Sequence, residues 1–109
     1  MLVRDPKTGD LVVGVTLNGA TEIGGTSYVS VAASGGGPSQ DALIVRLRAD
    51  GSVRWVHQLG GPGVDTVLGI AVDGSGSVYA VGDFAGKLAV AAGSSLTSAG
   101  SRDAVLIKL

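Results

Sequence analysis

The residues best suited to catalysis are few and far apart in this sequence. His57 is the only histidine, and none of the 109 residues is cysteine. No G-x-S-x-G motif occurs in the chain, so the sequence offers no nucleophilic serine of this kind for which His57 could act as the base. One histidine without cysteine also falls short of the three or four ligands that zinc needs. We therefore expect no catalytic residue, no cofactor-binding residue and no metal site, and we interpret His57 as a surface or interface side chain.

Two acidic turns could be mistaken for calcium loops. The segment Asp73-Gly74-Ser75-Gly76 lacks the EF-hand spacing, because positions 75 and 77 are both serine. We interpret it as an Asx-type hairpin turn, in which the Asp73 carboxylate accepts hydrogen bonds from nearby backbone amides. The same interpretation applies to residues 5–10.

Two glycine-rich stretches could be mistaken for phosphate-binding loops. Residues 82–88 are one position too short for a P-loop, and Leu88 stands where Ser or Thr would hold magnesium. Residues 35–38 precede no helix whose N-terminus could hold a phosphate, and we assign them to a loop. The four aromatic residues are too scattered for nucleic-acid stacking and are assigned to packing: Tyr28, Trp55, Tyr79 and Phe84.

Composition and charge narrow the class of protein further. Hydrophobic residues make up 45% of the chain, which is incompatible with intrinsic disorder. The net charge of -1 offers no basic surface for nucleic acid, so we expect no nucleic-acid partner. The chain begins without a basic segment followed by an apolar one, and no apolar stretch is long enough to span a bilayer. We therefore expect no export signal and no membrane insertion.

Apolar residues alternate with polar ones over most of the chain, which is typical of β-strands. Residues 41–59 predict a hairpin with its turn at Asp50 and Gly51, and residues 66–82 predict a second hairpin. We expect little or no helix, because no helical stripe escapes interruption by glycine. The predicted strands are 1–4, 11–17, 41–48, 52–59, 66–72, 77–84 and 103–109.

Internal repetition supports this assignment. Residues 9–19 align with residues 76–86, which lie 67 positions further on, and residues 41–47 align with 103–109, which lie 62 positions further on. The difference of five residues falls between Gly19 and Asp41, where we expect the first repeat to have a longer loop.

Several linked motifs resemble the bacterial SBBP-type β-propeller repeat. They are D-A-L-I-V-R-L at 41–47, D-G-S-V-R-W at 50–55, L-G-G-P-G-V-D at 59–65 and G-I-A-V-D-G-S-G-S-V-Y at 69–79. The resemblance covers residues 41–109 well and residues 1–40 poorly. Arg46 and Arg54 occupy positions that vary in the family, and Ser77 stands where Asn is usual.

The resemblance implies an all-β fold of antiparallel four-stranded propeller blades, with about one and three-quarter repeats in this chain. Residues 1–60 form blade 1, with strands a to d and a long loop at about 20–40, and residues 61–109 form blade 2, which lacks its last strand. Because adjacent blades pack face to face, we expect strands 66–72 and 103–109 to be buried on both faces.

A blade series that cannot close by itself implies a scaffold or interaction module instead of an enzyme. Its expected partners are other propeller blades, in the same protein or in a homo-oligomer, and protein or carbohydrate ligands are also open. The resemblance implies a bacterial cell-surface or extracellular location. Two alternatives remain: a fragment of a propeller lyase or hydrolase with its catalytic residues elsewhere, and a carbohydrate-binding propeller module.

Overall fold

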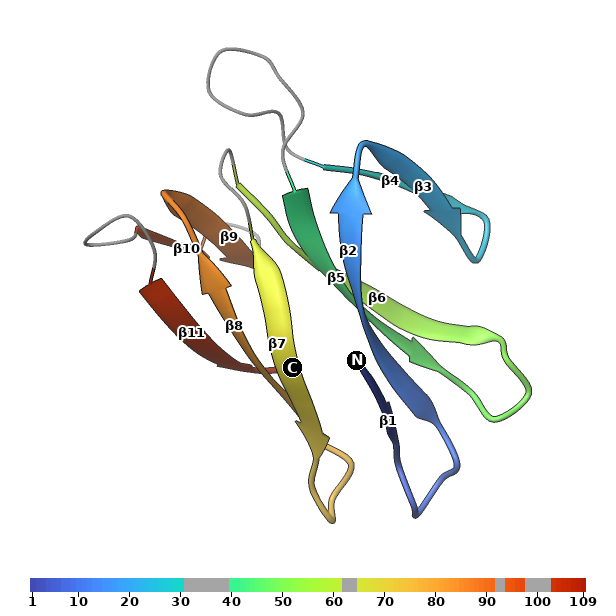
Figure 1. The fold of residues 1–109 in the computed structure, drawn as a ribbon. Helices are drawn as coiled ribbons and strands as arrows, with labels where there is room; N and C mark the ends of the chain where they lie inside the picture. The colour runs from blue at the N-terminus through green and yellow to red at the C-terminus, as the bar shows by residue number, and fades with distance from the viewer. Residues whose placement is uncertain (31–39, 62–64, 92–93, 98–102) are drawn as a thin grey trace.

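Two antiparallel β-sheets form most of the computed structural model, which describes residues 1–30, 40–61, 65–91, 94–97 and 103–109 (Figure 1). The first sheet has the strand order β1–β2–β5–β6, and the second has the order β11–β8–β7. The described residues contain no helix, and so none that could cross a membrane. The strands are β1 (Leu2–Arg4), β2 (Leu11–Asn18), β5 (Gln40–Leu47), β6 (Val53–Leu59), β7 (Thr66–Val72), β8 (Val78–Phe84) and β11 (Asp103–Lys108).

These seven strands confirm those expected from the alternation of apolar residues. The two expected hairpins are also present, since β5 pairs with β6 and β7 pairs with β8, both antiparallel. The all-β class is thereby confirmed for the described part of the chain.

Each sheet carries a small extra hairpin that we did not predict. In the first repeat the hairpin follows β2 and consists of β3 (Ala20–Ile23) and β4 (Thr26–Val29). In the second it follows β8 and consists of β9 (Lys87–Ala91) and β10 (Ser94–Thr97). Gly19 and Gly86 precede the two hairpins at φ of 80° and 72°, a conformation that favours glycine. The long loop expected at about 20–40 is therefore wrong over residues 20–29, and the expected loop at 35–38 lies outside the described residues.

The main hydrophobic core lies between the two sheets. Val12 and Ile44 of the first sheet and Val78, Ala80 and Phe84 of the second are all buried in it. The second sheet approaches through β7, which lies against β1, β2 and β5 (Figure 1). The two sheets thus pack face to face as layers.

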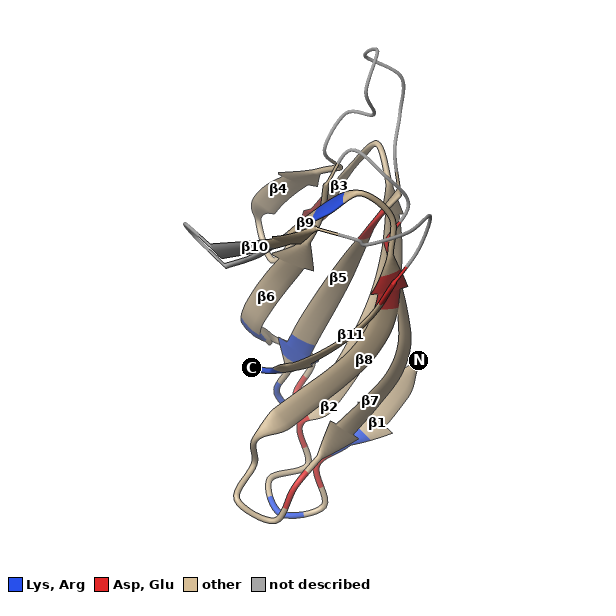
Figure 2. Ribbon diagram, turned by 90° about the vertical axis from the view of Figure 1, so that its left-hand side faces the viewer, with Lys and Arg blue, Asp and Glu red and all other residues tan. Residues whose placement is uncertain are grey.

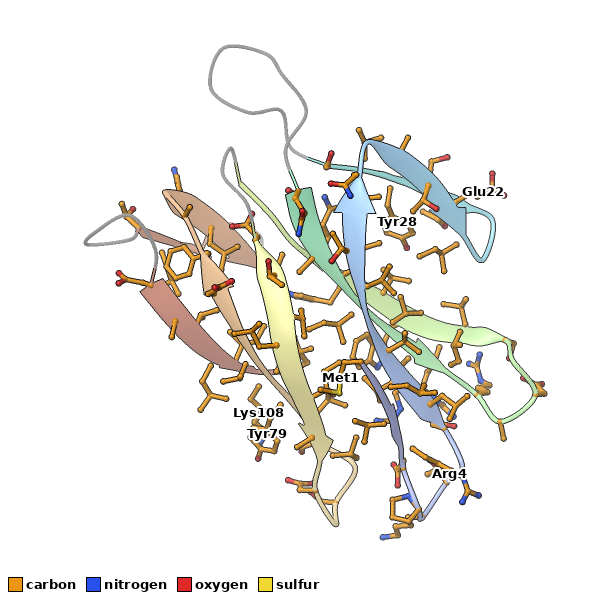
Figure 3. All side chains as sticks on the ribbon, viewed as in Figure 1. Met1, Arg4, Glu22, Tyr28, Tyr79 and Lys108 are labelled. Carbon is orange, nitrogen blue, oxygen red and sulfur yellow. The ribbon has the colours of Figure 1, made fainter. Side chains whose placement is uncertain are left out.

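The other face of the first sheet is covered by the chain's own β3–β4 hairpin. Leu17, Leu43 and Val45 are buried there, and Ile23 and Tyr28 of the hairpin pack against them. Figure 3 shows Tyr28 between the hairpin and the sheet. As a result β5 is buried on both faces over nearly its whole length.

The expectation that β7 and β11 are buried on both faces is wrong. Along β11 half-buried and exposed residues alternate strictly, and β7 also exposes part of its surface. The physical reason is that, within the described residues, the second sheet packs against the first through its inner face. Its outer face exposes Leu106 and Val81 together with Lys108.

The Gly60-Gly61 pair of the L-G-G motif follows the end of β6, where the Asp41 side chain and the backbone of β9 come close to the chain. A side chain at position 60 would collide with the carboxylate of Asp41, and one at position 61 would collide with the backbone carbonyl of Lys87 on β9. Glycine is therefore required at both positions by close approach.

A buried cluster of charges around Arg46 joins the two sheets. The Arg46 guanidinium donates through Nε to Asp10 Oδ2 and through Nη2 to Asp5 Oδ2, both at 2.8 Å, and through Nη1 to the carbonyl oxygen of Gly76 at 3.0 Å. Arg54 also donates to Asp10. The carboxylates belong to the β1–β2 turn and the carbonyl to the β7–β8 turn, and Figure 2 shows charged residues gathered around these turns.

The carboxylates of the cluster are ionised at neutral pH. The backbone N–H of Lys7 holds the pKa of Asp5 below its usual value, and the Arg46 guanidinium adds to this lowering against the opposing effect of burial. Arg54 and then Arg46 lower the pKa of Asp10 in the same way. Because both pKa values are lowered in the folded state, their contribution to stability is present at neutral pH and is lost as the solution becomes acidic.

Removing the guanidinium should destabilise the protein strongly. We expect Arg46→Met to lower the free energy of unfolding by about 3 kcal/mol or more, because it leaves two buried carboxylates without their shared counter-ion. The exposed Arg48 provides a matched control two residues away, and Arg48→Met should cost no more than about 0.5 kcal/mol. Urea unfolding of both variants measures the difference, and equal losses would contradict the assigned role of the cluster.

Candidate functional site on the outer face of the second sheet

The outer face of the second sheet carries a row of exposed apolar side chains. Leu106 of β11 and Val81 of β8 are register partners, and they are 70% and 42% exposed. Tyr79 pairs with Lys108 on the same face. Because paired residues point to the same side of a sheet, these four side chains form one surface. We call it the outer face.

A shallow recess of about 280 Å³ lies in this surface. Its lining includes Tyr79, Val81 and Leu106, and at Gly69 there is no side chain to fill the space. The Lys108 Nζ atom lies 5.8 Å from the centroid of the Tyr79 ring, which lines the recess, and Figure 3 shows the two side chains near each other. The recess can therefore receive an apolar side chain, with a cation beside it.

The structure places His57 on β6, where it is half-buried. Its register partner is Ile44, whose side chain belongs to the core between the sheets, so His57 is on the face that the second sheet covers. Trp55 lies on the same face and packs against that core, and Phe84 is buried within it. The interpretation of His57 as an interface side chain and of these aromatics as packing residues agrees with this placement.

The β7–β8 turn is the Asx-type turn expected from its sequence. Asp73 Oδ1 accepts hydrogen bonds from the backbone N–H groups of Ser75 and Ser77 and from the Ser75 hydroxyl, at 2.8 to 3.0 Å. Asp73 Oδ2 accepts one from the Tyr79 hydroxyl at 3.2 Å. The Ser75 hydroxyl first and then the Ser77 amide lower the pKa of Asp73 to about 2.

The β1–β2 turn is also of this kind, since the Lys7 amide donates to Asp5 Oδ1 at 2.9 Å. What we did not predict is that its two carboxylates bind Arg46. Arg46 and Arg54 occupy positions that vary in the family, and both bind Asp10, so the family pattern gave no indication of the cluster.

A second recess, of about 360 Å³, opens beside this cluster. The Asp5 and Asp10 carboxylates that line it have lowered pKa values, which makes them weak bases at neutral pH. Within the described residues no three His, Cys, Asp or Glu side chains are grouped closely enough to hold a metal ion. The recess thus offers donors from Arg54 and Lys7 but no poised acid–base pair.

The backbone of the β7–β8 turn allows the turn to be tested without disturbing its side chains. Gly76 has a φ of +87°, whereas Gly74 does not lie in the left-handed region and has open space around it. We expect Gly76→Ala to destabilise the protein by about 1 kcal/mol or more, and Gly74→Ala to have little effect. Calcium should not change either melting temperature. A rise of several degrees with calcium, abolished by Asp73→Ala, would contradict the Asx-turn assignment.

The lowered pKa of Asp73 predicts a specific pH dependence. Since the folded-state pKa is about 2 and the ordinary value is 3.8, the charge on Asp73 stabilises the fold above about pH 4, and this contribution is lost as the pH falls through about 2. The difference in unfolding free energy between the wild type and Asp73→Asn should therefore be constant from pH 7 to about 4 and shrink towards pH 2. Urea titrations of both proteins measure it, and a difference unchanged at pH 2 would contradict the prediction.

Residues 54–83 match the family model described as SBBP: Beta-propeller repeat. Neither a curated protein nor a solved structure matches the chain. The matched segment begins in β6 of the first sheet and ends in β8 of the second, so it contains the connection between them. Residues 54–83 of this chain therefore match the β-propeller repeat of the SBBP family.

Proposed function

We propose that this chain is a non-enzymatic β-propeller repeat segment that acts as a scaffold or interaction module. The observation that carries the proposal is the outer face of the second sheet, which exposes Leu106 and Val81 beside an apolar recess. Isolated exposed apolar residues are common, but Leu106 and Val81 are register partners that line one recess, and adjacent exposed apolar side chains of this kind are typical of interaction surfaces.

The partner that suits this face is another propeller blade, in the same protein or in another copy. In this proposal the first sheet is a four-stranded blade within residues 1–60, and the second sheet is a blade within residues 61–109 that lacks its outermost strand. The family repeat includes the connection between the two sheets, which supports sheet-to-sheet packing as the property that is repeated. The strand β11 lies at the edge of its sheet, where a further strand can add to it.

The charged groups of the described residues are in keeping with an interaction module. Asp5, Asp10 and Asp73 are held as hydrogen-bond acceptors with lowered pKa values, and His57 faces the core between the sheets. In this proposal these groups serve the fold and not a reaction. The proposed location at a bacterial cell surface or outside the cell rests on the family resemblance.

A single substitution on the outer face tests the proposal. The weight-average mass of the wild type should rise above 10.7 kDa as its concentration increases from micromolar to millimolar in sedimentation equilibrium. Leu106→Lys should weaken this association at least about tenfold, since burying a leucine contributes about 2 kcal/mol. Leu106→Ile keeps the apolar surface and should associate like the wild type. A mass that stays at 10.7 kDa at all concentrations would contradict the proposal.

A further inference from the structure

The contact between the two sheets within the chain shows how one repeat covers another. The second sheet lies with its inner face on the first, and β7 crosses β1, β2 and β5. Gly14 of β2 is the point of closest approach, because a side chain there would touch Val67 and Ile70 of β7, each about 3.1 Å away. The face of the first sheet that receives this contact is therefore known residue by residue.

The outer face of the second sheet is the repeat counterpart of that covered face. Residues 76–86 match residues 9–19, and residues 103–109 match residues 41–47, so β8 corresponds to β2 and β11 to β5. Each outer-face residue therefore has a counterpart that the second sheet covers in the first repeat. The pairs are Tyr79 with Val12, Val81 with Gly14, Leu106 with Ile44 and Lys108 with Arg46.

The same correspondence identifies the surface that can cover the outer face. Ile70 pairs with Ala80 across β7 and β8, and Leu2 pairs with Val13 across β1 and β2. Because Ala80 and Val13 are repeat counterparts, Leu2 is the counterpart of Ile70. Ile70 packs against the core residues of the first sheet, whereas Leu2 is 62% exposed. The β1–β2 half of the first sheet thus presents an exposed copy of the surface that β7 and β8 use.

We infer that the outer face of the second sheet binds the β1–β2 half of the first sheet of a second copy of this chain, in the register that the two sheets of one chain already use. This inference rests on the proposed function and specifies its partner. In this register Leu2 of the second copy lies beside Val81, over the space left open at Gly69. Because Val81 carries a side chain where its counterpart Gly14 has none, the two sheets of this contact lie further apart than the two sheets within the chain.

A polar contact fixes the same register. Within the chain Arg46 donates to the carbonyl oxygen of Gly76 in the turn of the covering sheet. The counterpart of Arg46 is Lys108, and the counterpart of Gly76 is Gly9, which shares its left-handed backbone with φ of 79° against 87°. Lys108 of one copy therefore donates to the carbonyl oxygen of Gly9 in the next. Lys108 is exposed and lies over Tyr79, at the side of the recess.

The two surfaces differ, so the contact is heterologous: each copy offers one surface to one neighbour and the other surface to the next. Such contacts extend beyond a dimer, into closed rings or open filaments. A symmetrical contact between two outer faces makes a different prediction, because it uses Leu106 twice and leaves Leu2 out.

Complementation between two variants separates these arrangements. Leu106→Lys damages the outer face and leaves the β1–β2 surface intact, whereas Leu2→Lys does the reverse. Each variant alone should associate at least tenfold more weakly than the wild type. An equimolar mixture should recover the wild-type affinity but stop at a dimer of one copy of each, measured by sedimentation equilibrium or native mass spectrometry. Leu2→Ile and Leu106→Ile are the matched controls and should assemble normally.

Two outcomes would overturn the inference and are distinguishable from each other. If Leu2→Lys associates like the wild type and the mixture gains nothing, the outer face binds a different surface, and the proposed interaction module stands with another partner. If the wild type itself remains monomeric, the proposed function fails together with the inference. Both lysines replace exposed side chains, so unchanged circular dichroism and melting temperature show that each variant is folded.

Disulfide trapping provides a second readout, because the chain has no cysteine of its own. Mixing Leu2→Cys with Val81→Cys under mild oxidation should give a covalent dimer in the mixture and little in either variant alone. Ser52→Cys, on the exposed β5–β6 turn, replaces Leu2→Cys as the control and should not cross-link to Val81→Cys. Cross-linking of Val81→Cys to itself at the same rate would indicate the symmetrical contact and overturn the inference.

Discussion

The relative position of the two sheets depends on one buried guanidinium. Arg46 must satisfy its charge and its N–H groups away from water, and an unpaired buried charge costs several kcal/mol. Its acceptors come from two turns, with carboxylates of Asp5 and Asp10 on the first sheet and the carbonyl of Gly76 on the second. The hydrophobic core would tolerate some sliding of one sheet over the other, because apolar contact is not directional. The guanidinium has a fixed geometry and does not tolerate such sliding, so it fixes the position of the β7–β8 turn over the first sheet.

The strands could be predicted from the sequence because each depends on local alternation and on turn residues. The hairpins at 20–29 and 87–97 could not be predicted, since their strands are only four or five residues long and their alternation is too short to recognise. The Arg46 cluster was equally hidden. Arg46 lies 36 and 41 residues from its two carboxylates, and a charged residue in an alternating strand normally indicates a solvated face. The β7–β8 turn, in which Asp73 binds only residues up to six positions away, was predictable because its contacts are local.

Apolar residues on both sides of a strand indicate that both sides are packed, but the pattern does not identify the elements that pack against them. In β5 one side meets the second sheet and the other meets the β3–β4 hairpin, and the strand is buried throughout. The matching strand β11 has the same apolar pattern and is covered on its inner side only. Leu106 in the second repeat is thus as apolar as its buried counterpart Ile44 in the first.

The two repeats differ in the side chain at the position of Arg46 and Lys108, and this difference corresponds to whether another sheet covers that position. Where the covering sheet is present, the position holds an arginine with two buried carboxylates, and such a buried cluster requires that every charge in it be paired. Where the chain provides no cover, the same position holds Lys108, a compact, strongly hydrated cation that rests on an aromatic ring. An exposed lysine keeps the hydration of its ammonium group, and it can donate a hydrogen bond to a backbone carbonyl oxygen when a partner binds. In the proposed contact it would form one directed bond where Arg46 forms three, so we expect that contact to be weaker than the contact inside the chain.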